Sequence, residues 1–123
     1  MIKGVGNDIL EVDRIRQTIE KHGTHFYQKV FTETELEYCL GHKDSAIHLA
    51  GRFSAKEAIA KALGIGFGKS ISFHDIEITN DELGRPLVEF SDRVNERFHF
   101  PQILVSISHC KKYANAVALW LDS

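Results

Sequence analysis

The chain has 123 residues, of which 43% are hydrophobic and 26% are charged, and its formal net charge is -2 at pH 7. This length predicts one domain, residues 1–123, that buries about two thirds of its unfolded surface around a single core. The slightly negative charge argues against bulk electrostatic attachment to nucleic acid or to an anionic membrane. Any phosphate recognition must therefore come from the local placement of cations.

The composition also indicates a compartment. The opening residues, MIKGVGNDILEVDRI, carry charged side chains where a signal peptide needs an uninterrupted apolar core, and no segment approaches transmembrane length. Cys39 and Cys110 are the only cysteines and form no C-x-x-C pair, which favours a reducing environment. We expect a cytoplasmic protein that does not enter a membrane.

The first part of the chain predicts one strand followed by helices. IKGVGNDI alternates loosely, is rich in β-branched residues, and predicts a strand that ends near Asp8. A helix follows the strand and stops at Gly23. Thr32 and Glu35 have the spacing of a reciprocal capping box, and the short helix that they begin is expected to end at Leu40.

A longer helix is expected next. Asp44 or Ser45 can cap its first turn, and its apolar pattern continues to Leu63. Gly64 then stands where a left-handed closing residue is favourable. Apolar residues occupy more than one side of this helix, which is typical of a helix covered by several neighbours.

The second half of the chain predicts strands separated by one further helix. ISFHDIEIT and PLVEFS form a hairpin whose turn contains Gly84, with a bulge expected near His74 and Asp75. SDRVNERFHF predicts an amphipathic helix capped by Ser91, and QILVSISHC and YANAVALWL predict two long strands around a Lys-Lys turn. We expect an α+β fold with a mainly antiparallel sheet packed against the long central helix.

Four charges interrupt the apolar pattern of the central helix. The stretch RFSAKEAIAKALG contains Arg52, Lys56, Glu57 and Lys61. At about 100° per residue, Glu57 falls within the apolar stripe and is expected to point toward the core. Its spacing from Lys61 also fits a surface salt bridge worth about 0.3 kcal/mol. A carboxylate taken out of water must be paired or bound to a metal. The spacing alone therefore does not decide between a surface salt bridge and a buried carboxylate that belongs to a site.

Asp8 supplies a second carboxylate at the end of a strand, where it can project beside a packed helix. Two carboxylates on rigid elements, with cations nearby, suit a hard divalent ion that bridges phosphate oxygens. His109 ends the strand segment SISH at a turn, where a side chain can reach a cleft. A surface histidine remains the simpler interpretation of that position taken alone.

The segment GIGFGKS, residues 64–70, looks like a phosphate-binding P-loop but lacks one residue between its first glycine and the Gly-Lys-Ser end. Its context is also inverted, because it follows a helix and enters a strand. We expect a helix cap and a flexible connection here. A P-loop nucleotidase is correspondingly disfavoured.

Four motifs carry a family resemblance. GVGNDILEVDRI, RFSAKEAIAKALG, LGRP and SISHCKKYANAVAL, in this order and at this spacing, resemble the holo-acyl-carrier-protein synthases, which are the small 4'-phosphopantetheinyl transferases. The resemblance extends from Gly4 to Leu119. It implies Mg²⁺-dependent transfer of the phosphopantetheine arm of coenzyme A to a serine of an apo acyl carrier protein in fatty acid biosynthesis, with release of adenosine 3',5'-bisphosphate.

The resemblance also implies residue roles. Asp8 and Glu57 would hold Mg²⁺ and, with Lys61, form the catalytic group. Lys61 and His109 would face phosphate oxygens of coenzyme A, and Arg52 would be a further phosphate contact. Lys56 belongs to the motif without a specific task. Glu57, or a water that it orients, is the candidate base for the serine proton, and the water is favoured because a bound metal lowers the basicity of a carboxylate.

The family's partner is a strongly acidic carrier protein. Arg14, Arg16 and Lys21 make the first helix locally basic, and Arg14 matches the position that meets the carrier, with Lys21 expected to assist. A solvated face balanced by neighbouring acidic residues is the alternative interpretation. The family also implies a homotrimer with active sites between subunits.

Departures from the family pattern lie beside these residues. Asn7 stands where the family more often has threonine, and Lys111 with Lys112 makes the turn after His109 unusually basic. The main alternative function is a non-catalytic module that binds coenzyme A or a carrier protein. The retained carboxylate pair favours the enzyme, because a pure binding module needs no metal.

Overall fold

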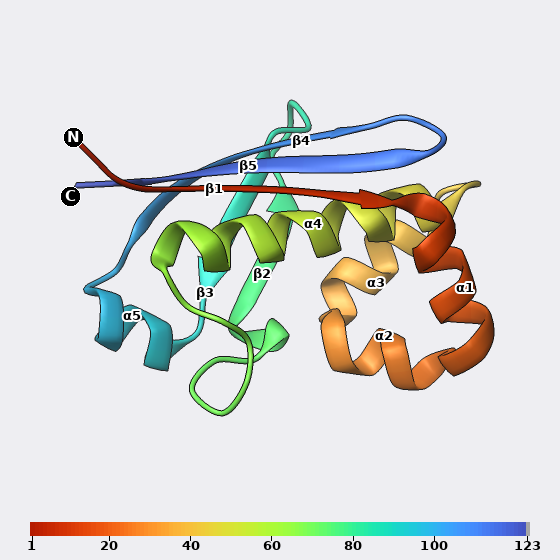
Figure 1. Ribbon diagram of the computed structural model, residues 1–123, viewed down its shortest axis with the longest axis horizontal. Coiled ribbons are helices and arrows are strands. Elements are labelled where there is room, and N and C mark those ends of the chain that lie inside the picture. Colours follow the sequence, from red (N-terminus) through yellow and green to blue (C-terminus); the bar gives the residue numbers. More distant parts are fainter. Residues whose placement is uncertain (123) are drawn as a thin grey trace.

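The fold is organised around one long helix, α4 (Figure 1). The computed structural model describes residues 1–122. The strands are β1 (Ile2–Glu11), β2 (Ile76–Asn80), β3 (Pro86–Phe90), β4 (Gln102–His109) and β5 (Tyr113–Leu121). The helices are α1 (Val12–His22), α2 (Thr24–Val30), α3 (Glu33–Leu40), α4 (Ser45–Leu63) and α5 (Asp92–Phe98), with a 3₁₀ turn η1 (Phe73–Asp75). The expected α+β class is confirmed.

One face of an antiparallel sheet, ordered β1-β5-β4, packs against α4. Small residues on the two nearer strands let the helix approach their backbones. A Cβ atom added at Gly6 would lie only 1.8 Å from the carbonyl oxygen of Ala58, and one added at Gly4 would lie 2.1 Å from that of Ala62. Only glycine fits at such an approach. Because residues alternate along a strand, Asp8 faces the helix on the same side as Gly6.

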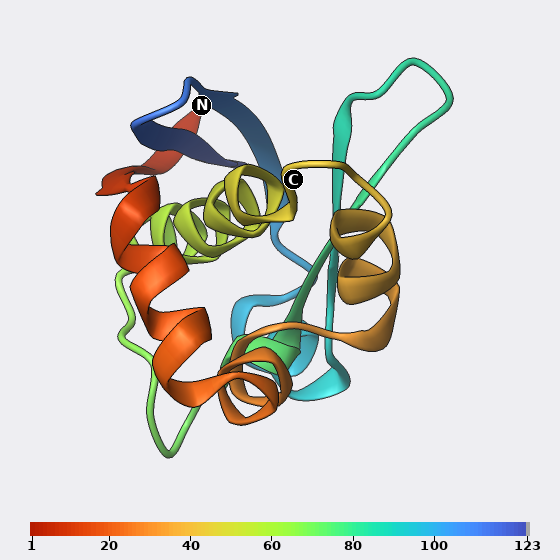
Figure 2. The same ribbon diagram turned by 90° about the vertical axis from the view of Figure 1, so that its right-hand side faces the viewer.

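The hairpin β2-β3 forms a separate two-stranded sheet, in register from Ile76 opposite Phe90. Viewed end-on, α4 lies between the three-stranded sheet, the helices α1 and α3, and this hairpin (Figure 2). The turn between β2 and β3 contains Gly84 at φ 86°, as its sequence predicts. Asp81 stabilises the turn by accepting hydrogen bonds at 2.9 Å from the backbone N–H groups of Leu83 and Arg85.

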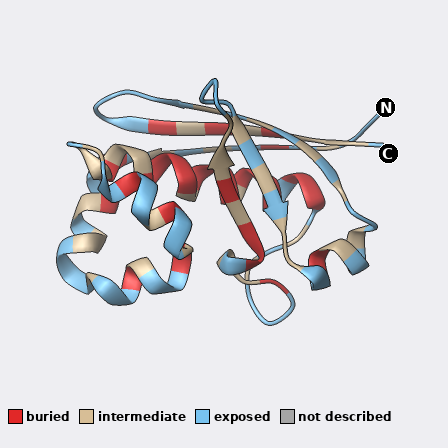
Figure 3. Ribbon diagram, turned by 180° about the vertical axis from the view of Figure 1, so that it is seen from behind, coloured by how far each residue is buried: buried red, intermediate tan, exposed pale blue. Residues whose placement is uncertain are grey.

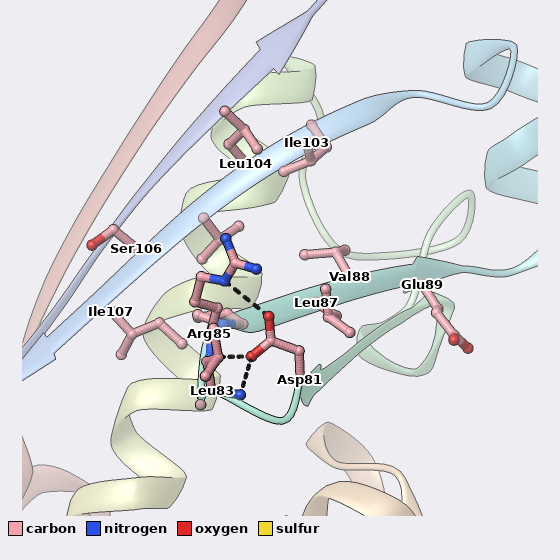
Figure 4. A pocket seen from close by; sticks show the side chains of 13 residues that line it. Asp81, Leu83, Arg85, Leu87, Val88, Glu89, Ile103, Leu104, Ser106 and Ile107 are labelled. Atoms are coloured by element: carbon pink, nitrogen blue, oxygen red, sulfur yellow. Dashed lines mark hydrogen bonds and ion pairs between the residues drawn. The ribbon is translucent and has the colours of Figure 1, made fainter.

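A groove of about 800 Å³ runs between β3 of the hairpin and β4 of the larger sheet (Figure 4). Leu87 and Val88 line it from β3, and Leu104 and Ile107 line it from β4. The side chains of Asp81 and Arg85 form an ion pair at its mouth. The groove arises because β3 and β4 belong to different sheets.

Burial extends along almost the whole length of α4 (Figure 3). The fully buried charge on this helix is Lys56 rather than Glu57, which is half-buried. The Nζ atom of Lys56 lies 2.7 Å from Oε1 of Glu35 on α3, and both side chains are 0% exposed. The ammonium group also donates to the carbonyl oxygens of Val30 at 2.8 Å and Phe73 at 2.9 Å.

Glu35 satisfies two further groups. Its Oε1 accepts a hydrogen bond from the N–H of Thr32, which completes the predicted capping box, and its Oε2 accepts one from the N–H of Ile78 at 2.8 Å. The buried pair therefore links α2, α3, α4, η1 and β2. Burial lowers the pKa of Lys56, while the Glu35 carboxylate opposes that shift. Lys56 thus has a structural task that its motif did not reveal.

Some boundaries differ from their predictions. β1 continues past Asp8 to Glu11, because its pairing with β5 extends to the end of that strand. Residues 73–75 form η1 before β2 instead of a bulge within it. The helix α2 was not predicted, and Phe26 and Val30 are the two residues that it buries. Four of its seven residues lie at exposed positions, so its apolar signal is weak.

Two predicted helix caps also have other roles. Asp44 occupies the N-cap position of α4, but its carboxylate binds Arg16 instead of the helix N–H groups. Ser91 precedes α5 and donates its hydroxyl to Asp75, with no side-chain cap. Gly64 closes α4 in the left-handed conformation at φ 75°, as predicted. None of the helices in residues 1–122 combines the length and apolarity needed to cross a bilayer.

Removing one member of the buried ion pair should be strongly destabilising. Lys56→Met should lower the free energy of unfolding by about 3–5 kcal/mol, because it leaves the Glu35 carboxylate buried without a counter-charge. The double variant Glu35→Gln/Lys56→Met should recover part of that loss, since the remaining amide is neutral. Urea unfolding followed by circular dichroism measures both. A loss below about 1 kcal/mol for Lys56→Met would contradict the structural role.

Candidate active site

Asp8 is held in a defined orientation between β1 and α4. Its Oδ2 lies 2.9 Å from the Ser54 hydroxyl, which is also 3.1 Å from the Asp8 carbonyl oxygen. Asn115 on β5 donates its side-chain amide to the same carbonyl at 2.8 Å. The Lys61 ammonium lies 3.3 Å from Oδ1 and donates to the carbonyl oxygen of Asn7 at 3.0 Å. The carboxylate is therefore fixed by two side chains of α4, and the backbone that carries it is bonded to α4 and β5.

Glu57 projects from α4 one turn before Lys61 and close to Asp8. Burial raises the pKa of Glu57, and the negative charge of Asp8 raises it further, while Lys61 acts in the opposite direction. The repulsion between the two carboxylates is only partly relieved by one lysine. The structure thus brings Asp8, Glu57 and Lys61 together, as the sequence predicts for the catalytic group.

This carboxylate pair fits a magnesium ion. Mg²⁺ is usually bound by one or two carboxylates together with waters and substrate phosphates, in contrast to metals that need a full protein cage. Within residues 1–122, no group of three or more His, Cys, Asp or Glu side chains is arranged as such a cage. Asp8 and Glu57 provide two hard oxygen donors with an unbalanced negative charge, which matches the requirement of Mg²⁺.

Arg52 lies on the other side of α4. It is nine residues before Lys61, which at 100° per residue places the two side chains about half a turn apart. Arg52 is only 5% exposed, and its guanidinium donates to Oδ1 of Asn80 and stacks 4.5 Å above the ring of Tyr38. Its Nε has no hydrogen-bond partner among the described residues. A buried cation with an unpaired donor is ready to bind an anion.

His109 lies in the same pocket as Arg52. The pocket has a volume of about 160 Å³ and is lined by residues of α3, α4, the β2-β3 hairpin and β4, including Tyr38, His48, Arg52, Asn80, Pro86 and His109. His109 ends β4, and Asp8 lies on β1, so β5 separates the two strands in the sheet. In one chain, the predicted site residues therefore form two separate groups, one at Asp8, Glu57 and Lys61 and the other at Arg52 and His109.

The sequence reasoning missed several side chains that orient these groups. Ser54 and Asn115 position Asp8, while Asn80 and Tyr38 position Arg52. Those contacts join residues 28 or more positions apart in three of the four cases, so no local spacing reveals them. His48 is different, because it lies four residues before Arg52 on α4 and its spacing indicates a shared helix face.

The predicted partner-binding residues are on α1. Arg14 is exposed, with its Nε 3.8 Å from Oε1 of Glu11, and Lys21 is exposed as well. Arg16 differs because Asp44 holds it by two hydrogen bonds at 3.0 and 2.9 Å. Arg14 and Lys21 are therefore the available cations of this face, and the Arg16 guanidinium is engaged within the chain.

The segment GIGFGKS has no P-loop geometry. Gly64 closes α4, the segment is followed by the short turn η1 and then β2 instead of by an α-helix, and Phe67 stacks on Phe73 at 3.9 Å between ring centroids. Asn7, the departure from the family pattern, donates its side-chain amide to the carbonyl oxygen of Ala116 at 3.1 Å. This bond joins β1 to β5 next to Asp8.

The sequence profile of the 4'-phosphopantetheinyl transferase superfamily matches residues 4–118. The chain belongs to this superfamily. It is 52% identical over 120 residues to a holo-[acyl-carrier-protein] synthase of Protochlamydia amoebophila, a match that covers 98% of each chain. The resemblance inferred from the four motifs is therefore confirmed.

Solved structures of the superfamily have the same fold. A holo-[acyl-carrier-protein] synthase of Helicobacter pylori in complex with coenzyme A has a TM-score of 0.87 and 33% identity, covering 95% of this chain and 99% of the other. A synthase of Bacillus anthracis in complex with coenzyme A (3',5'-ADP) has a TM-score of 0.85 and 38% identity, covering 100% and 99%. This transferase is thus similar, over its full length, to enzymes crystallised with coenzyme A.

Proposed function

We propose that the protein is a Mg²⁺-dependent holo-acyl-carrier-protein synthase. It would transfer the 4'-phosphopantetheine group of coenzyme A to a serine of an apo acyl carrier protein and release adenosine 3',5'-bisphosphate, in support of fatty acid biosynthesis. The observation that carries the proposal is the pair of carboxylates, Asp8 and Glu57, beside the Lys61 ammonium in a chain of this superfamily. The free thiols of Cys39 and Cys110 are consistent with a cytoplasmic location.

The residue roles follow from the charges in the reaction. Asp8 and Glu57 would hold Mg²⁺, which when bound neutralises charge on the diphosphate oxygens. Lys61 adds a fixed cation at 3.3 Å from Asp8, and phosphoryl transfer depends mainly on such alignment and charge stabilisation. Ser54 keeps the Asp8 carboxylate oriented. Arg52 and His109 would bind other phosphate oxygens of coenzyme A.

Glu57 is also placed to handle the serine proton. The carrier serine oxygen forms a bond to the phosphorus on the pantetheine side, and the phosphorus–oxygen bond to adenosine bisphosphate breaks. The hydroxyl proton must leave as this happens. Glu57, directly or through a water that it orients, is the candidate acceptor, and the water is favoured because a carboxylate that holds Mg²⁺ is itself a weaker base.

The transferase is tested by the intact mass of an apo acyl carrier protein after incubation with the protein, coenzyme A and Mg²⁺. We expect a gain of one phosphopantetheine group that a chelator abolishes. Glu57→Gln should fold normally and lose activity by a factor on the order of 100, since the amide lacks the required charge. Glu96→Gln, on the exposed side of α5, is the matched control and should behave like the wild type.

Two outcomes would contradict this function. Near-normal turnover of Glu57→Gln with unchanged Mg²⁺ dependence would remove Glu57 from the reaction. No mass gain with the wild-type protein, with several carriers and with folding confirmed, would favour the alternative of a non-catalytic module that binds coenzyme A or a carrier protein.

The carrier would dock on α1. Arg14 and Lys21 are exposed cations, and Arg14 lines a pocket of about 270 Å³ together with Ile9 and Tyr113. Such a surface suits an acidic protein with an apolar contact at its centre, and its attraction to that protein should weaken with salt.

Charge reversal tests this surface. Arg14→Glu/Lys21→Glu should raise the KM for the carrier by about tenfold at low salt while leaving the KM for coenzyme A unchanged, because only long-range attraction is lost. The difference should shrink at high salt. Arg97→Glu on α5 is the control for a change of surface charge elsewhere. An unchanged carrier KM in the double variant would exclude α1 as the docking surface.

The complete site would form between copies of the chain, in a homotrimer. In one chain the carboxylate group and the Arg52 pocket face different sides of α4, so a neighbour could supply the second half. The outer face of the β1-β5-β4 sheet offers an apolar surface for assembly, since Val5, Ile9 and Leu104 are 60%, 64% and 59% exposed. Exposed apolar patches of this kind favour protein contacts.

Mixed oligomers test the shared site. Glu57→Gln and Arg52→Gln should each be nearly inactive alone, whereas co-expressed chains should recover about one quarter of wild-type activity, because a quarter of the interfaces then pair two intact halves. Differently tagged copies allow the mixed species to be isolated and weighed by sedimentation. No recovery in a verified mixed oligomer would place the whole site within one chain.

A further inference from the structure

Three histidines converge at the mouth of the Arg52 pocket. His42 follows α3, His48 lies on α4, and His109 ends β4. The ring centroids of His42 and His48 are 3.8 Å apart at an interplanar angle of 31°, and those of His48 and His109 are 5.4 Å apart. His48 and His109 both line the pocket that contains Arg52. Three distant segments therefore place imidazole groups beside one buried guanidinium.

The hydrogen bonds of the cluster leave ring nitrogens available. The Nδ1 atom of His42 is 2.9 Å from the carbonyl oxygen of Tyr38, and a carbonyl can only accept, so His42 carries its proton on Nδ1. Its Nε2 is then the free nitrogen. Tyr38 lies against both His42, at 4.7 Å, and the Arg52 guanidinium, at 4.5 Å. The Tyr38 ring therefore contacts both the Arg52 guanidinium and the His42 imidazole.

The charges around His48 favour its neutral form when no anion is present. Burial lowers the pKa of His48, and His42, His109 and Arg52 lower it further, while Asp44 acts in the opposite direction. Asp44 is itself engaged in an ion pair with Arg16, through two hydrogen bonds. Tyr38 is a further titratable neighbour, with its ring centroid 6.0 Å from that of His48, and the polar neighbour Asn80 is already bonded to Arg52.

A phosphate group would reverse this balance. Arg52 combines 5% exposure with an Nε that has no partner in the described part of the chain, so its charge is poorly solvated and an anion in the adjoining pocket would stabilise it. A dianion next to three imidazoles would favour their protonated forms. Histidine is the side chain whose charge changes most readily near neutral pH.

We propose that His48, which lies between His42 and His109, takes up a proton when a phosphate group binds beside Arg52. Phosphate affinity at this pocket is then linked to pH. The proposal rests on the proposed function only for the identity of the natural ligand. That ligand would be the phosphomonoester of coenzyme A, because the diphosphate would bind at Asp8 and Glu57. His48 thereby becomes a binding residue that no sequence motif indicated.

The sign of the pH dependence follows from linkage. If a bound phosphate raises the pKa of His48, affinity increases as pH falls toward that raised value, by at most about tenfold per pH unit for each proton taken up. Below about pH 6 the second ionisation of a phosphomonoester opposes the gain. We expect affinity to be about two- to threefold higher at pH 6.5 than at pH 8.0.

Nuclear magnetic resonance of the imidazole C–H groups tests the proposal directly. The titration of His48, assigned by the loss of its signal in His48→Phe, is followed without ligand, with inorganic phosphate and with coenzyme A. Its pKa should rise by about one pH unit with either ligand. The phenylalanine keeps an aromatic ring between His42 and His109 but cannot be protonated. His25→Gln, an exposed histidine on α2, is the matched control.

Binding measured by calorimetry at pH 6.5 and 8.0 completes the experiment. The wild type and His25→Gln should both show the gain in affinity at the lower pH, and His48→Phe should lose it. If coenzyme A binds but the pKa of His48 stays constant, the proton-linked pocket is wrong and the transferase proposal stands. If inorganic phosphate raises that pKa and coenzyme A does not bind, the pocket stands and the transferase proposal falls.

Discussion

The contact between α4 and the backbones of β1 and β5 is the constraint on which the rest of the structure depends. Gly4 and Gly6 leave no side chain between strand and helix, and the alanines of β5 continue this thin layer across the sheet. The helix therefore packs directly against the backbone of the sheet. Asp8 and Glu57 lie close together because of this contact. Each is within two residues of the closest approach between strand and helix, which is at Gly6 and Ala58.

On its other sides, α4 is held to α3 and the neighbouring segments by a buried ion pair as well as by apolar packing. The buried Glu35–Lys56 pair joins α3 to α4 and satisfies backbone groups from three more segments. One residue further along the helix, Glu57 is only half-buried, and under the proposed function its charge must stay accessible to ligands. Adjacent charges in one motif thus divide into a structural and a chemical role, and the division follows from which neighbour each side chain meets.

Much of this could be predicted from the sequence where the signal is local. Capping residues, turn glycines and apolar alternation located the long helix, the hairpin and the last two strands, and the four motifs brought Asp8, Glu57 and Lys61 into one hypothesis. Contacts between segments far apart in the sequence could not be predicted from these local patterns. Tertiary packing determines the partner of Lys56, the hydroxyl that orients Asp8 and the imidazoles around Arg52. Glu57 was expected to be the buried charge of the helix, and the structure buries Lys56 instead.

The bare backbone contact between Gly6 and Ala58 fixes the distance between the strand and the helix that carry the site. In most cores, the distance between two elements can drift as one packing side chain is exchanged for a slightly larger or smaller one. No such exchange exists here, because an added carbon at Gly6 would lie 1.8 Å from an oxygen atom. The spacing of the two carboxylates is thus set by contact between backbones and does not depend on the size of any packing side chain.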